Sequence, residues 1–234
     1  MTKLCIGVSA AERVGCSRGR LVAVAMIFAW SALQVGCTHS RLVQDGQTIA
    51  SSANPSLVLW VAPAFRPLPP LTFPIESLTD VDRRVFVDAD DRGTVRRLVI
   101  VQFETVQVTS RFKFVYAPKP PAAFGVQTYR FGAYVHDEET EAAQSPRKEA
   151  GLTRAFLLAK GLKVPAVFRV ARLARVADSA GNSEVIIFYM EAADADYPAR
   201  PLPGADQDGD LDLEADAARA MLERLKSVVL PISG

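Results

Sequence analysis

Short apolar runs alternate along the chain with polar or proline-rich breaks, and most of the runs have the length of strands. The uninterrupted apolar run at 98–101 is typical of a strand that is covered on both faces. Gly93 and Gly181 lie in Asp- and Asn-containing segments that favour turns, and Gly93 suits a positive φ. Runs rich in apolar, β-branched and aromatic residues predict strands at 57–62, 85–87, 95–105, 112–116, 126–135, 166–176 and 184–191.

Two segments have helical spacing instead. Ser145 can cap a helix, Pro146 fits its first turn, and Gly161 follows its last residue, which predicts a helix over 146–160. A second helix is predicted over 213–229, where apolar residues recur every three or four positions. The order of several strands, a helix, a hairpin and a helix predicts an α+β fold: a mainly antiparallel β-sheet with two helices packed on one face.

Prolines and charges mark the segments without a regular pattern. Five prolines between Pro63 and Pro74 exclude a helix or a central strand and predict an extended loop. The acidic run at 137–141 is typical of a solvated loop. We therefore expect residues 57–234 to form a single α+β domain with a proline-rich loop at 63–74.

The amino-terminal segment has the layout of an export signal. Arg18 and Arg20 precede the apolar run at 21–33, which is shorter than a typical membrane span. The run ends in Leu33-Gln34-Val35-Gly36-Cys37, and residues 13–40 resemble the signal of bacterial lipoproteins, in which small residues precede an acylated cysteine.

The resemblance implies that residues 1–36 are a signal peptide and that Cys37 carries the lipid. Residues 37–56 then read as a lipid-anchored flexible tether, because they are polar and have no apolar period. Thr38 is not the Asp that retains many such proteins in the inner membrane, so the expected location in a didermic cell is the outer membrane, facing the periplasm. Two alternatives stay open, an uncleaved signal anchor and ordinary secretion, and all three place the domain outside the cytoplasm.

Charge and cysteine content narrow the possible functions. The formal charge is +1, and four basic residues and one acid fall in residues 1–36, which leaves −2 on the rest. A near-neutral body without a basic stripe argues against nucleic acid as a partner. Cys5, Cys16 and Cys37 are the three cysteines, so the body after Cys37 has no disulfide, thiolate metal site or cysteine nucleophile.

Three groups of residues are candidates for chemistry. His136 could serve a hydrolase only if a distant serine and carboxylate meet it, since no nucleophile-elbow, phosphate-loop or zinc-protease motif occurs. Phe112, Phe114 and Tyr116 alternate on a predicted strand and form either core or an apolar ligand pocket. Alternate acids suggest calcium, or else acids that favour a helix start: Asp206, Asp208, Asp210 and Asp212.

These patterns predict a non-enzymatic envelope lipoprotein, attached to the membrane by its lipid, that binds a partner protein or an apolar ligand. An envelope hydrolase using His136 and a lipid carrier are the alternatives. No cofactor other than the candidate calcium ion is expected.

Overall fold

The computed structural model describes residues 41–44, 46–53, 55–116, 119, 121–193 and 211–232. All of them belong to the compact unit that begins at His39. Cys37 and three of the four candidate calcium ligands, Asp206, Asp208 and Asp210, lie outside these ranges. Of Asp212 only the backbone is described, in a strand.

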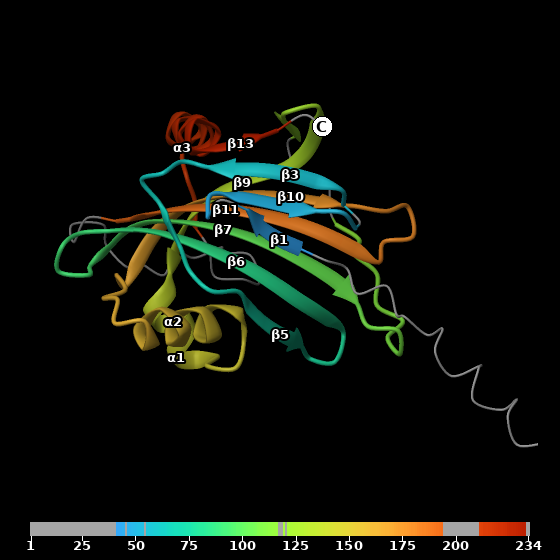
Figure 1. The fold of residues 1–234 in the computed structure, drawn as a ribbon, viewed down its shortest axis with the longest axis horizontal. Helices are drawn as coiled ribbons and strands as arrows, with labels where there is room; N and C mark the ends of the chain where they lie inside the picture. Colours follow the sequence, from blue (N-terminus) through green and yellow to red (C-terminus); the bar gives the residue numbers. More distant parts are fainter. Residues whose placement is uncertain are drawn as a thin grey trace, which may run out of the picture. The chain divides into compact units, whose positions relative to one another are not determined.

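A large antiparallel sheet forms the centre of the domain (Figure 1). Two further strands pair with its members: β5 (Leu71–Ile75) with β6 (Thr79–Ala89), and β8 (Pro121–Phe124) with β9 (Gln127–Asp137). Six of the seven predicted strands are confirmed, five as long members of this sheet and one in the small sheet described below, whereas residues 112–116 form no strand. In order across the sheet, the strands are β12 (Leu211–Asp212), β9 (Gln127–Asp137), β10 (Val167–Val176), β11 (Ser183–Ala192), β7 (Val95–Val106), β6 (Thr79–Ala89) and β4 (Arg66–Pro67).

A second, four-stranded antiparallel sheet contains residues that the sequence assigns to the tether. Its order is β1 (Arg41–Gln44), β2 (Thr48–Ser51), β3 (Leu57–Val61) and β13 (Val229–Pro231). Ile49 has no exposed surface. The prediction of a flexible tether is therefore wrong from Arg41 onward, because strands of four residues are too short to give a visible alternation in the sequence.

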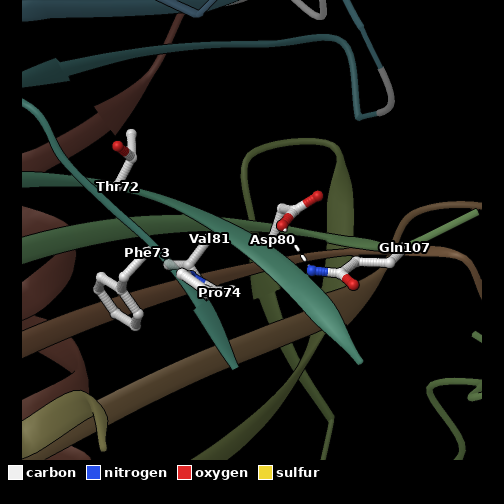
Figure 2. A pocket seen from close by; sticks show the side chains of 6 residues that line it. All are labelled: Thr72, Phe73, Pro74, Asp80, Val81 and Gln107. Atoms are coloured by element: carbon white, nitrogen blue, oxygen red, sulfur yellow. Dashed lines mark hydrogen bonds between the residues drawn. The ribbon is translucent and has the colours of Figure 1, made fainter. Parts of the chain in front are cut away.

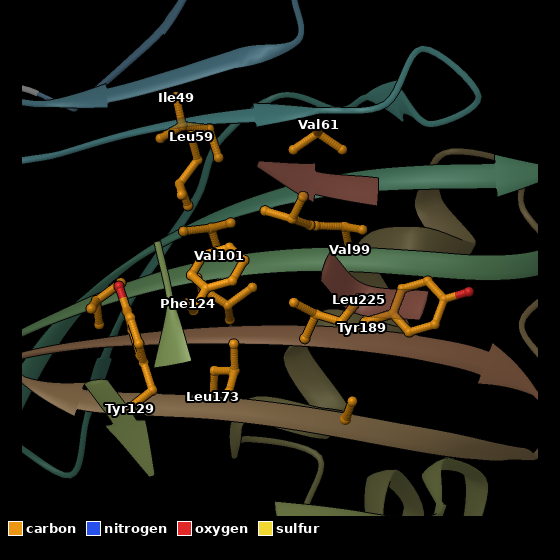
Figure 3. Close-up of a cluster of buried hydrophobic side chains, with 14 of the residues drawn as sticks. Ile49, Leu59, Val61, Val99, Val101, Phe124, Tyr129, Leu173, Tyr189 and Leu225 are labelled. Carbon is orange, nitrogen blue, oxygen red and sulfur yellow. The ribbon is translucent and has the colours of Figure 1, made fainter. Parts of the chain in front are cut away.

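The large sheet buries apolar side chains on both faces. On one face, Val99, Val101 and Leu173 point toward Ile49, Leu59 and Val61 of the small sheet (Figure 3). Helix α3 (Ala215–Val228) adds Met221 and Leu225 to this cluster. On the opposite face, Leu98, Ile100 and Val170 pack with Leu157 of α2 (Glu149–Ala159), and α1 (Glu138–Gln144) packs against α2.

The α+β class with a dominant antiparallel sheet is confirmed, but the helices are arranged differently from the prediction. There are three in the described ranges, and the two predicted ones, α2 and α3, contribute to clusters on opposite faces of the large sheet. The long central strands are apolar on both sides, so each face needs its own cover.

Two of the predicted loops contain regular structure. The acidic run forms α1, because the Asp137 carboxylate accepts a hydrogen bond from the Thr140 amide (2.9 Å) and the acids that follow favour a helix N-terminus. The proline-rich segment at 63–74 contains β4 and most of β5, and Pro74 is tolerated because β5 pairs on one side only, with β6.

The integration of residues 41–56 into the domain predicts a stability effect at Ile49. Ile49→Ala should lower the free energy of unfolding by about 2–5 kcal/mol, because it leaves a cavity in the core. Val108→Ala, at a fully exposed valine, is the matched control (104% exposed). Urea denaturation of both variants checks this, and equal, small effects would contradict a folded β2.

Candidate functional site

A group of polar side chains lies buried on the face of the large sheet that α2 covers. We call it the Arg83 network; its members come from β6, β7 and α2. All but Glu149 are at most 5% exposed. The network consists of Thr79, Arg83, Gln102, Glu104, Glu149 and Thr153.

Arg83 joins the sheet to the helix. Its Nη2 lies 2.5 Å from Oε2 of Glu149, and its Nε donates to Oε1 of Gln102 (2.6 Å). It also donates to the hydroxyl of Thr153, one turn further along α2. Burial lowers the pKa of Arg83, while the charges of Glu149 and Glu104 oppose that effect. The guanidinium thus holds the start of α2 against the sheet.

Glu104 lies beside this pair with an unusual proton affinity. Its carboxylate accepts from Nε2 of Gln102 (2.6 Å) and from the hydroxyl of Thr79 (3.3 Å). Burial, and then the negative charge of Glu149, raise its pKa to about 7. Glu104 therefore changes its protonation state near neutral pH, inside the domain.

A third carboxylate extends the network to β11. Glu184 is directly opposite Glu104 in the sheet register and has no exposed surface. The hydroxyl of Tyr116 donates to its Oε2, and the guanidinium of Arg130 lies over the Tyr116 ring (4.1 Å to the centroid). Burial raises the pKa of Glu184, which the hydrogen bond from Tyr116 and the charge of Arg172 partly offset.

This arrangement can bind and release protons while it fixes a helix. Three carboxylates, Glu104, Glu149 and Glu184, share one buried region with Arg83 and Arg172. Glu149 is 37% exposed at its side chain, so it connects the network to solvent. Buried groups with shifted pKa values are typical of functional sites and also of structural ion-pair networks.

The structure gives His136 carboxylate neighbours at both ring nitrogens. Its Nε2 lies 2.9 Å from Oε2 of Glu138, and its Nδ1 lies 3.3 Å from Oε2 of Glu141. A hydrolytic base needs one nitrogen directed at a nucleophile. Asp137, next in the chain, caps α1 instead.

The three predicted pocket aromatics do not share a strand face. Phe114 is buried, with its amide donating to the Gly181 carbonyl (3.0 Å), whereas Phe112 is 38% exposed. Tyr116 joins the buried carboxylates, as described above. A shallow, open groove of about 440 Å³ lies elsewhere, on the β5–β6 hairpin and the residue after β7 (Figure 2), lined by Thr72, Phe73, Pro74, Asp80, Val81 and Gln107.

The remaining sequence candidates are not described by the structure. Cys37 stays a predicted lipid site, and the calcium site stays a prediction because its side chains lie outside the described ranges. Within those ranges, no three His, Cys, Asp or Glu side chains are grouped to hold a metal ion. No helix there is long and apolar enough to span a bilayer.

Sequence reasoning missed the Arg83 network, although a signal was present. Gln102 and Glu104 occur at alternate positions of a strand whose neighbouring residues are apolar. In a strand covered on both faces, such polar residues must be buried. Their partners Arg83 and Glu149 are 19 and 47 residues distant from Gln102, so pairing could not be read from spacing.

Comparisons with known proteins give no family. No protein-family model matches the chain, no curated protein matches its sequence, and no solved structure matches its fold. The site must therefore be interpreted from its own geometry.

The raised pKa of Glu104 predicts that the free energy of unfolding falls as the pH rises. Its folded-state pKa is above the ordinary value of 4.5, so its contribution is complete below pH 4.5 and is lost as the pH rises through about 7. Glu104→Gln should remove up to about 3 kcal/mol of this pH dependence. Urea unfolding at both ends of that range measures it. Glu139→Gln, at a side chain 65% exposed, is the control, and identical pH profiles for wild type and Glu104→Gln would contradict the assignment.

Removal of Arg83 should be far more costly than removal of an exposed arginine. Arg83→Ala leaves buried acceptors without their donor and should destabilise by about 3–5 kcal/mol. Arg96→Ala breaks an ion pair with Asp88 from a side chain 62% exposed and should cost about 1 kcal/mol or less. Thermal and urea denaturation compare the two variants; similar losses would mean that Arg83 does not hold α2.

Proposed function

We propose that this chain is a non-enzymatic lipoprotein of the cell envelope, anchored through acylated Cys37, whose α+β domain binds a partner protein. The support for the anchor is the signal-like segment at residues 13–40, which ends in Gly36-Cys37. Two or more acyl chains are sufficient for stable attachment, because each buried methylene contributes about 0.8 kcal/mol.

The observation that carries the proposal is the start of the fold, four residues after Cys37. Strand β1 begins at Arg41, so residues 38–40 alone separate it from the cysteine. Fully extended, this connection reaches about 14 Å. A cysteine acylated at this position keeps the domain next to the bilayer, in contrast to the long tether expected from the polar composition of residues 38–56.

Binding is favoured over catalysis by the way the titratable groups are engaged. His136 contacts two carboxylates, and the acceptors of Glu104 receive hydrogen bonds from Gln102 and Thr79. Tyr116, expected in an apolar pocket, donates to Glu184. These contacts give less support to the two alternatives, a hydrolase using His136 and a carrier with an apolar pocket at the aromatic residues.

Mass spectrometry of the membrane-extracted protein tests the anchor. We expect loss of residues 1–36 and added acyl mass, both abolished in Cys37→Ala. Cys16→Ala, earlier in the same segment, is the matched control and should be processed normally. An unmodified, uncleaved amino terminus in the wild type would overturn the proposal and indicate a signal anchor.

A further inference from the structure

Several turns of the chain lie together at one end of the domain, which we call the hairpin end. Strand β7 finishes there, and both the β8–β9 and the β10–β11 turns lie there, because Thr105 pairs with Ser183 and Arg175 donates to Gln127. The loop at 107–116 follows β7 and is held to the β10–β11 turn through the Phe114 amide.

The small sheet has one end at the same place. A Cβ added to Gly125, in the β8–β9 turn, would lie 2.6 Å from Cγ of Pro231 in β13, so these two segments touch. The amide of Ile232, the next residue, donates to the Val58 carbonyl. Leu57, beside Val58, pairs with Ser51, and Ser51 pairs with Arg41, so the first residue of β1 lies at this end of the small sheet. The first residue of β1 and the end of β7 lie toward the same side of the domain, on the right in Figure 1.

Exposed apolar side chains are concentrated at this end. Seven large apolar side chains are exposed in the described ranges, and all of them except Leu158 of α2 lie at the hairpin end. Leu158 lies near Gly161, which contacts Gly93 at the opposite end of β7. A gathering of exposed apolar residues marks a protein or membrane contact, whereas scattered ones need no explanation. The six at the hairpin end are Val108, Phe112, Val115, Val126, Leu230 and Ile232.

The charges near the loop favour an anionic surface. Arg111 and Lys113 flank Phe112 and are exposed. Two acids of this end are engaged within the domain: Asp178 accepts from backbone amides of its own turn, and Asp80 accepts from Gln107. Glu76, in the β5–β6 turn, is an exposed acid of this end, against the exposed bases Arg111 and Lys113. Exposed apolar residues next to basic ones are typical of segments that enter the headgroup region of a bilayer.

We propose that the hairpin end rests in the surface of a lipid bilayer, with the loop at 107–116 inserted among the headgroups. This proposal rests on the proposed anchor, since a lipid on Cys37 and a connection of residues 38–40 hold the start of β1, at this same end, close to the membrane. The opposite end, with α2 and Leu158, then faces away from the bilayer and is free for a protein partner.

Tryptophan quenching by brominated lipids tests the docking. The full chain is purified as Phe112→Trp, Val126→Trp and Leu158→Trp and reconstituted in vesicles of brominated phosphatidylcholine with phosphatidylglycerol. We expect Phe112→Trp and Val126→Trp to lose about twofold more fluorescence than Leu158→Trp, measured against the parent chain, because only the hairpin end meets acyl chains.

The two proposals fail in distinguishable ways. Intact mass of the same sample reports acylation of Cys37, and quenching reports docking whether or not the lipid is present. Quenching at position 112 no greater than at position 158 overturns the docking. A photo-crosslinker at position 112 that attaches to a protein rather than to lipid in cells overturns it too, in favour of a protein interface.

Discussion

The fold depends on burial of both faces of the large sheet. Strands β7 and β11 are apolar on each side for most of their length, so neither face can be left to solvent. The small sheet and α3 cover one face, and α1 with α2 cover the other. Because β1 and β2 belong to the first cover, the domain extends almost to Cys37, and this requirement removes the long tether that polar composition suggests.

Covering the face under α1 and α2 buries polar side chains, and the hydrogen bonds of the Arg83 network offset the free-energy cost of that burial. On this face Gln102, Glu104 and Glu184 are buried along with apolar residues, and buried polar groups need partners. Arg83 supplies donors to both the sheet and the helix, yet one carboxylate keeps a pKa of about 7. The attachment of α2 is thereby coupled to pH. Glu104 itself lies near the hairpin end, since Thr105 pairs with Ser183 and Tyr116 of the loop at 107–116 donates to Glu184.

The sequence predicted the class and most of the long strands, because their β-branched runs and the turn glycines are local signals. Gly93 and Gly181 have the positive φ that their turns require. Sequence could not place β1 and β2, because strands of four residues show little alternation and the packing of Ile49 against the large sheet is non-local. Nor could it assign α2 and α3 to opposite faces. It also assigned Tyr116 to an apolar face, since the aromatic ring is visible in the pattern but the hydrogen bond to Glu184, 68 residues away, is not.

Hydrogen exchange of the full chain tests the two-sided arrangement most directly. If the small sheet is an integral cover, the amides of β2 and β3 exchange as slowly as those of β7 and β11, because all open together in global unfolding. The account predicts this shared protection. Exchange of β2 at the rate of an unstructured segment, with β7 still protected, would contradict it.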